Sequence, residues 1–237
     1  GDSFKLGVGP FTDLTHEEFK DQYIGMIEYD NDDRLISNEE EVLESSNLGS
    51  IQEIDWTSHM NDDKASQGVC GSCWAISTIM AIEGNHSVQY GEKRKLSVQD
   101  LLECDIFDEK CKGGNQISAL EHIIINGVAY ESSHNYIAGE TRMIGQCRTD
   151  VNRVFPVESF KYCAYGNCSR EKTIELLKSG PIAVRMDAVT KRDFQHYAGE
   201  MLTVDNFPCR SMNHGAVLIG LKVDSIDQQP YYIVKNT

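Results

Sequence analysis

The sequence contains no stretch that approaches the roughly 18 consecutive apolar residues of a transmembrane helix. It is also short of cations, with 22 Lys and Arg against 37 Asp and Glu and a formal net charge of −15. These deficits argue against an integral membrane protein and against a nucleic-acid partner held through its phosphates. With 237 residues, of which 40% are hydrophobic and 25% charged, the chain still suffices for a globular core.

Negative charge is concentrated in the first fifth of the chain. Residues 1–50 contain 13 acidic and 3 basic residues, a net charge of −10, and residues 51–237 carry the remaining −5. Residues 26–50 combine acidic runs with few aromatic side chains, which is typical of a solvated linker. The sequence lacks an initiator methionine, a signal peptide and a polar tail, so we expect a fragment of a longer chain.

Eight cysteines are more than a typical cytosolic chain carries, and their spacing favours disulfides over a metal site. Zinc ribbons need a second Cys-x-x-Cys pair or a following His pair, and the sequence has only Cys70-Gly-Ser-Cys73. We therefore expect no metal or other cofactor. Two Asn-x-Ser sequons, at Asn85 and Asn167, fit a secretory route.

After residue 51, helical patterns dominate the first part of the chain and strand patterns the second. Helix starts are indicated by capping residues and acidic first turns, and helix ends by glycines such as Gly84. Short runs rich in Val, Ile and Tyr predict strands after Pro181. This order predicts an α+β fold of two lobes. The expected elements are a helix starting at Thr15, helices over 72–84, 97–104, 117–127 and 169–179, and strands over 182–186, 214–222 and 231–236.

Cys73 has the features of an activated nucleophile. It lies in the first turn of the predicted helix, where free backbone N–H groups and the helix dipole favour a thiolate. Gly71 and Ser72 leave the approach to the sulfur uncrowded. The side-chain amide of Gln67 and the backbone N–H of Cys73 offer two hydrogen-bond donors to a developing oxyanion.

A thiolate nucleophile needs a proton partner, and His214 is the candidate among seven histidines. It opens an apolar strand, Ala216-Val-Leu-Ile-Gly220, which would hold its imidazole at the mouth of a rigid element. Asn236 ends the next strand-like run, and in an antiparallel pairing its amide would reach the ring and fix its tautomer. The other six histidines are expected to be structural.

The segment Cys70-Gly-Ser-Cys73-Trp74 resembles the signature of the papain-like cysteine proteases, in their cathepsin L-like branch. His214 follows Cys73 by 141 residues, within the family range of roughly 130–150, and Asn236 follows it by 163. The longer spacing is attributed to the loop over 223–230. Further segments similar to the family are Gly7 to Asp13, Asp55-Trp56, Leu96 to Cys104, Cys111 to Gly114 and Gly180 to Val184.

The resemblance implies a papain-like fold with a helical N-terminal lobe and an antiparallel, β-barrel-like C-terminal lobe. The active site would lie in the cleft between them. Residues 1–25 would be the C-terminal part of an inhibitory propeptide, and residues 26–48 an acidic linker with the processing site near its end. Residues 49–237 would be the peptidase domain, truncated at its C-terminus.

The same resemblance implies a cysteine endopeptidase made as a zymogen. Cys73 would be the nucleophile, His214 the acid/base, Asn236 the group that orients the imidazole, and Gln67 the oxyanion donor. Gly113 and Gly114 would pair with an extended substrate by strand addition. The predicted substrate-binding residues are Gly71, Gly113, Gly114, Arg185, Met212, Asn213 and Gly215.

Disulfides and partners also follow from the resemblance. Cys70 would pair with Cys111 and Cys104 with Cys147, and the partner of Cys209 would lie beyond this fragment. Cys163 and Cys168 would close a small loop, an inference from their spacing alone. Expected partners are polypeptide substrates, the chain's own propeptide and cystatin-like inhibitors. We expect a monomer. Its expected location is a lysosome or digestive vacuole, or outside the cell after secretion.

Arg185 departs from the family, which usually has a small residue at this point of the main specificity pocket. We expect it to shrink the pocket or to favour an acidic or polar side chain, unless it points to solvent. Two other function classes stay open. One is a redox protein that uses Cys70 and Cys73, but the sequence lacks the βαβ pattern such a protein needs, and this role gives His214 and Asn236 no function. The other is a non-catalytic binding or storage relative, but such relatives usually have the nucleophile replaced, and Cys73 is present.

Overall fold

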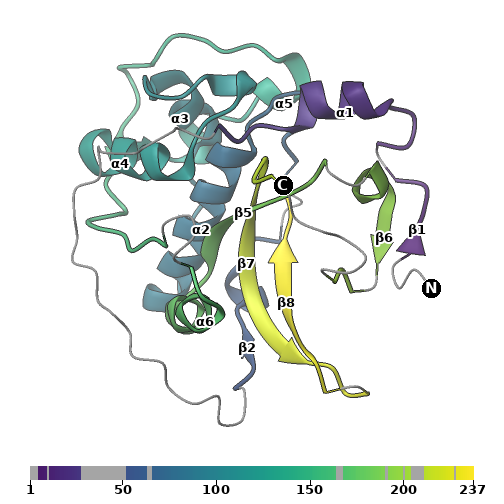
Figure 1. Cartoon of the computed structure of the whole chain (residues 1–237). Helices are drawn as coiled ribbons and strands as arrows, with labels where there is room; N and C mark the ends of the chain where they lie inside the picture. The colour runs from purple at the N-terminus through teal and green to yellow at the C-terminus, as the bar shows by residue number, and fades with distance from the viewer. Residues whose placement is uncertain are drawn as a thin grey trace.

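The helix that begins at Cys73 runs through the middle of the protein, with further helices on one side and an antiparallel sheet on the other (Figure 1). The computed structural model describes residues 5–9, 11–27, 52–62, 66–163, 168–189, 192–199, 201–203, 211–226 and 228–237. Asn167, Cys209 and most of the expected linker over 26–48 lie outside the described residues. None of the described helices is long and apolar enough to span a bilayer.

The central helix α2 (Cys73–Tyr90) is longer than the sequence predicts. Residues 73–84 are all buried, which explains why they lack a polar face. Gly84 does not end the helix. Its role is close packing, since a Cβ there would lie 2.8 Å from Cγ of Pro181. The helix ends at Gly91, which has the left-handed φ of 71°. The predicted end was therefore wrong.

The helical lobe packs a core of Trp74, Leu102 and Ile123 under α2. The helices begin where they were predicted, because Ser97 and Asn115 cap them by accepting backbone N–H groups of Asp100 and Ile117. The elements of this lobe are α3 (Val98–Cys104), α4 (Gln116–Asn126), α5 (Ala138–Thr141), β3 (Val128–Ala129) and β4 (Arg153–Val154).

The second lobe is built on β7 (His214–Val223), the longest strand. One edge of β7 pairs with β5 (Ile182–Met186) and then with β2 (Ile54–Asp55), and the other pairs with β8 (Pro230–Lys235), all antiparallel. The helix α6 (Arg170–Ser179) packs beside this sheet through Leu177. The mixture of helices and antiparallel strands confirms the α+β class. The expectation of a barrel needs correction, because the sheet in the described residues is open.

The N-terminal segment forms its own small unit against the second lobe. Its strand β1 (Lys5–Leu6) pairs with β6 (Tyr197–Gly199), and α1 (His16–Tyr23) begins at Thr15 with a capping box, as predicted (Figure 1). Phe11, Phe19 and Tyr23 form an aromatic cluster with ring centroids 4.6 to 5.6 Å apart. The 3₁₀ helices of the chain are η1 (Thr57–His59), η2 (Lys110–Lys112), η3 (Glu131–Ser133) and η4 (Arg192–His196).

Disulfides join segments that carry the candidate site. The structure contains both bonds that the resemblance implies, Cys70–Cys111 and Cys104–Cys147, and also the short-loop bond between Cys163 and Cys168. Among the described cysteines, Cys73 alone is free. The sequon at Asn85 is structurally engaged, since its Nδ2 donates to the carbonyls of Ala81 and Pro181. A glycan on Asn85 would replace one of the two Nδ2 hydrogens, so both bonds could not be kept.

Candidate active site

Cys73 stands at the point where the two lobes meet. It is the first residue of α2 and is completely buried, with 0% of its surface exposed. The strand β7 starts directly beside it, since a Cβ on Gly215 would lie 2.8 Å from the Cys73 carbonyl oxygen. Only a glycine permits this approach, which brings the neighbouring His214 to the N-terminal turn of α2.

The buried ring of His214 bonds to the side chain of Asn236. Its Nε2 lies 2.7 Å from Oδ1 of Asn236, which can only accept, so Nε2 carries the ring proton. The other ring nitrogen, Nδ1, is buried and has no hydrogen-bond partner. With the proton on Nε2, Nδ1 is the ring nitrogen that can accept a proton, and the Tyr23 carbonyl near the ring does not lie in hydrogen-bonding geometry to it.

The amide of Gln67 faces the N-terminal segment. Nε2 of Gln67 donates to the backbone carbonyl of Tyr23 over 2.9 Å, and its Oε1 accepts from the hydroxyl of Thr237 over 3.0 Å. The Tyr23 carbonyl also acts on the His214 ring, where it raises the pKa. The carbonyl of Tyr23 thus lies between the predicted oxyanion donor and the predicted acid/base.

Residues 23–27 continue along the predicted substrate-binding residues. The backbone of Gly114 donates to the Gly25 carbonyl and accepts from Ile27, each over 2.9 Å, in a parallel bridge centred on Met26. The Met26 N–H donates to the carbonyl of Asn213 over 3.2 Å. The segment therefore uses both walls of the predicted site, and its main chain runs parallel to that of Gly114.

Gly25 passes so close to the nucleophile loop that no side chain fits. A Cβ on Gly25 would lie 2.1 Å from the carbonyl oxygen of Gly71. Gly113 lies beside Ile27, since a Cβ on Gly113 would lie 3.0 Å from the Ile27 side chain. Gly71, Gly113, Gly114 and Asn213 therefore all contact the segment that occupies the site.

Burial controls the charge of both candidate catalytic groups. It raises the pKa of the Cys73 thiol to about 11, although backbone groups of Gly215 and Gly25 lower it in part. Burial also lowers the pKa of His214, against the raising effects of Asn236 and Tyr23. Near neutral pH the covered site therefore holds a neutral thiol and a neutral imidazole.

Arg185 lies on the face of β5 that packs against α2. Side chains alternate along a strand, and Arg185 shares its face with Ala183, which packs with Ile76 and Met80 of α2. Arg185 pairs in register with Gly215, and Met212 is half-buried two residues before His214. This placement indicates that the Arg185 side chain points toward α2 rather than to solvent. Its effect on specificity stays a prediction.

Two residues that contact the site have no signal in the sequence. The hydroxyl of Tyr136 donates to the Gln67 carbonyl over 2.8 Å, and Nε2 of Gln195 donates to the carbonyls of Phe11 and Leu14 in the N-terminal segment. Both contacts join residues more than 60 positions apart, so neither periodicity nor a local motif reveals them.

The chain resembles known proteases in sequence and in structure. It is 31% identical over 248 residues to a "Probable cysteine protease" of Arabidopsis thaliana, a match that covers 98% of this chain and 65% of the relative. It is 32% identical over 244 residues to "Fruit bromelain" of Ananas comosus, covering 99% of this chain and 64% of the relative. The chain thus spans slightly less than two thirds of the length of these two relatives.

Solved structures of two proforms are similar over the whole chain. "Recombinant stem bromelain precursor" superposes with a TM-score of 0.77 at 30% identity, covering 99% of this chain and 72% of that one. Digestive procathepsin L 3 of Tenebrio molitor larval midgut has the same TM-score and coverages at 26% identity. The model described as "Papain family cysteine protease" matches residues 51–237. Over residues 51–237, the chain therefore belongs to the papain family of cysteine proteases.

Proposed function

We propose that the complete, processed protein is a cysteine endopeptidase that uses Cys73, His214 and Asn236 as its catalytic triad. One observation carries the proposal. The buried His214 ring is held by Asn236 through Nε2, its Nδ1 has no hydrogen-bond partner, and His214 begins the strand whose next residue, Gly215, packs on Cys73. This arrangement supplies a base of fixed tautomer beside a free thiol at a helix N-terminus.

In this mechanism Cys73 gives its proton to Nδ1 of His214, and the thiolate attacks the carbonyl carbon of a peptide bond. The oxyanion that forms accepts hydrogen bonds from Gln67 and from the Cys73 N–H. His214 then protonates the amine as the C–N bond breaks, which leaves an acyl-thioester on Cys73. Water that loses its proton to His214 attacks the thioester, releases the carboxylic acid and restores the thiol.

We propose further that the N-terminal segment keeps this enzyme latent until it is removed. The carbonyl of Tyr23 occupies the donor site of Gln67, and Gly25 to Ile27 occupy the backbone edge at Gly114. Burial under the segment also opposes the thiolate–imidazolium pair, because it raises the pKa of Cys73 and lowers that of His214. Its removal would expose the edge, free the donor and restore the charged pair.

The test is covalent labelling of Cys73 with a peptidyl epoxide in the complete chain. We expect labelling of the processed protein at Cys73, and labelling of the proform at least about tenfold more slowly, because burial disfavours the reactive thiolate. A processed protein that resists the epoxide would instead favour a non-catalytic binding or storage relative. Reversible two-electron activity without peptide hydrolysis would favour a redox role for Cys70 and Cys73.

Two glycine variants test latency within the same experiment. Gly25→Ala in the proform places a Cβ against the Gly71 carbonyl, so the segment has to leave its position and labelling should accelerate toward the processed rate. Gly9→Ala is the matched control in the same segment, because a Cβ there meets nothing within 4 Å. Equal labelling rates for both variants would contradict the proposed latency.

Substrate choice is proposed to depend on Arg185. Its position opposite Gly215 on the α2-facing side of β5 supports an effect on the pocket beside Cys73. We expect a preference for an acidic or polar side chain at the second position before the cleaved bond, which Arg185→Ala shifts toward Leu or Phe. A peptide-library profile checks this, and a Leu or Phe preference that Arg185→Ala leaves unchanged would refute it.

The cellular setting is likewise a proposal. Three disulfides among the described residues support maturation in an oxidising compartment, such as the route to a lysosome, digestive vacuole or the outside of the cell. Cystatin-like inhibitors would compete with peptides for the same backbone edge at Gly114. Size-exclusion chromatography of the processed protein with and without such an inhibitor tests this, and the absence of a complex would refute it.

A further inference from the structure

We propose that Tyr136 is a positioning residue that holds the oxyanion site in its working geometry through its hydroxyl group. The inference rests on the proposed peptidase function. The Tyr136 hydroxyl lies 2.8 Å from the Gln67 carbonyl oxygen and 2.7 Å from Oγ of Ser72. The carbonyl can only accept, so the single Tyr136 proton goes to Gln67. The Ser72 hydroxyl then donates to the Tyr136 oxygen, which is closer than its other acceptor, the Cys70 carbonyl at 3.3 Å.

The two partners of this hydroxyl flank the oxyanion site from both sides. Gln67 supplies the side-chain donor, and Ser72 directly precedes Cys73, which supplies the backbone donor. The Tyr136 hydroxyl thus links the main chain of Gln67 to the side chain of Ser72, which directly precedes Cys73. Errors of about 1 Å in such donors reduce catalysis strongly, because hydrogen bonds to an oxyanion depend on exact placement.

The loop between Gln67 and Ser72 has a second attachment to the same wall. The Val69 N–H donates to the Gly139 carbonyl over 2.8 Å. Gly68 has a left-handed φ of 58°, and a Cβ on it would lie 1.9 Å from that carbonyl oxygen. The nucleophile loop therefore packs closely against the segment over 136–139, and the Tyr136 hydroxyl adds side-chain contacts to Gln67 and to Ser72, the residue before Cys73.

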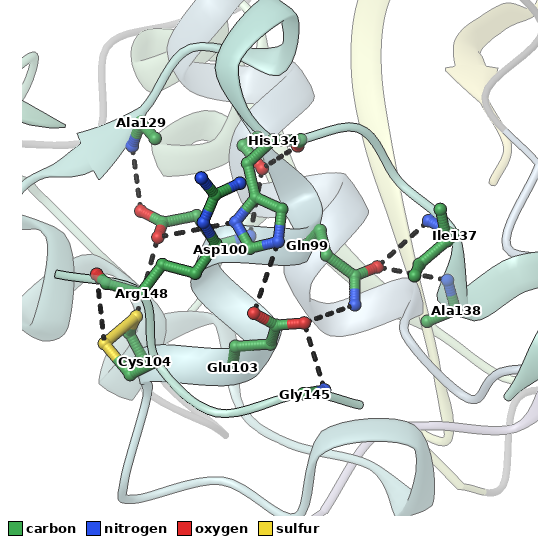
Figure 2. Close-up of polar contacts among 12 residues, drawn as sticks. Gln99, Asp100, Glu103, Cys104, Ala129, His134, Ile137, Ala138, Gly145 and Arg148 are labelled. Atoms are coloured by element: carbon green, nitrogen blue, oxygen red, sulfur yellow. Dashed lines mark hydrogen bonds and ion pairs between the residues drawn. A yellow bond between two sulfur atoms is a disulfide. The ribbon is translucent and has the colours of Figure 1, made fainter. Parts of the chain in front are cut away.

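A buried hydrogen-bond network fixes the backbone around Tyr136. Oε1 of Gln99 accepts from the N–H groups of Ile137 and Ala138, each over 3.0 Å, and the Tyr136 N–H donates to Glu131 over 2.9 Å. Figure 2 shows how the completely buried Gln99 is itself held, with Nε2 donating to Glu103 over 2.9 Å. Buried networks whose groups are all partnered are rigid, which suits a positioning role.

The surroundings keep Tyr136 protonated as a hydrogen-bond donor. Burial raises its pKa to about 12, against the opposing effect of Ser72, and the nearby Cys73 adds to the increase. The ring packs on the apolar cores of both lobes. Phenylalanine preserves this packing, so Tyr136→Phe isolates the hydroxyl.

The experiment uses the complete, processed protein with Tyr136→Phe. We expect kcat for a peptide amide to fall about tenfold or more with KM nearly unchanged, since the lost interaction acts on the oxyanion. Affinity for a peptide aldehyde, whose hemithioacetal oxygen would occupy the oxyanion site, should fall by a similar factor. Alkylation of Cys73 by iodoacetamide, and its pH profile, should not change, because that reaction forms no oxyanion.

Controls separate this role from general disturbance. Tyr90→Phe removes a hydroxyl from an exposed side chain on the same helix as Cys73 and should change none of the readouts. Ser72→Ala removes only the Ser72–Tyr136 bond and leaves the Tyr136–Gln67 bond, so kcat and aldehyde affinity should fall less than in Tyr136→Phe. The double variant should be little worse than Tyr136→Phe alone, because that change already removes the contact with Ser72.

Two results would overturn the inference. One is an unchanged kcat and aldehyde affinity in Tyr136→Phe. The other is a loss of alkylation rate in step with kcat, which indicates damage to the whole site. A wild-type protein without peptidase activity would instead refute the proposed function, so the two failures are distinguishable.

Discussion

Replacement of Cys73 by alanine is expected to reduce peptide hydrolysis by the complete, processed protein by at least about 10⁴-fold in kcat. No other free cysteine exists among the described residues. Without the thiol, the oxyanion donors retain a bound peptide but have no covalent intermediate to stabilise. Initial rates with a fluorogenic peptide, normalised to folded protein, measure the loss.

The same variant should bind peptides about as well as the wild type. Its backbone edge at Gly114 and the Asn213 carbonyl do not depend on the sulfur, so the Kd of a non-cleavable peptide should change by less than about threefold. His214→Ala should match the loss in kcat, since the thiol then lacks its proton acceptor. A Cys73→Ala variant with more than a tenth of wild-type activity would contradict the assigned nucleophile.

The second large effect is a loss of thermal stability as the pH rises from about 5 to about 8. Burial raises the pKa of Asp108 to about 7, and the adjacent Asp105 adds to this despite hydrogen bonds from Ser118 and Asn115. Burial also raises the pKa of Glu83 to about 7, although Leu96 and Asn61 donate to its carboxylate. In the unfolded chain such groups titrate near 4.

The sign follows from proton binding. Because both folded-state pKa values lie above the unfolded ones, the folded chain holds more protons between about pH 4 and pH 7. The stabilisation is complete below the unfolded pKa and is lost as the pH passes through the folded pKa. The lowered pKa values of His214 and His122 act in the opposite direction and offset part of this loss. The net loss amounts to a few kcal/mol, which lowers the Tm by roughly 5–10 °C.

Scanning calorimetry between pH 4 and pH 8 checks this. Asp108→Asn and Glu83→Gln should each flatten the decline of Tm with pH, because a neutral amide replaces a carboxyl that resists ionisation. Asp62→Asn serves as the control, since that side chain is 96% exposed and its loss should leave the slope unaltered. A Tm that is constant or rises from pH 5 to pH 8 would contradict the prediction.

Local chemistry explains what was predictable. Cys73 is recognisable as the candidate nucleophile because the sequence around it combines a helix start, small neighbours and a signature tryptophan within a few residues. The strands β5, β7 and β8 follow from short runs of β-branched and aromatic residues, and Ser97 and Ser169 mark helix starts with their own side chains. Such signals are carried by neighbours in the chain, so they survive without knowledge of the fold.

The glycines show where local chemistry stops. Gly84 and Gly91 are equivalent as helix ends in the sequence, yet Gly84 packs against Pro181 and only Gly91 adopts the left-handed conformation. Gly25 gives no local sign that it passes the nucleophile loop. Each difference depends on a partner far along the chain.

The sequence by itself predicted the α+β class, and it singled out the candidate nucleophile Cys73 with its candidate partners His214 and Asn236. The family resemblance added the two disulfides Cys70–Cys111 and Cys104–Cys147, which the structure contains. Only the tertiary structure decided that the Tyr23 carbonyl accepts from the Gln67 amide, that the Tyr136 hydroxyl contacts both Gln67 and Ser72, and that the second lobe forms an open sheet in the described residues. The physical reason is range. Capping, periodicity and motif chemistry act over a few residues, whereas burial, hydrogen-bond partners and pKa shifts arise only when distant segments meet.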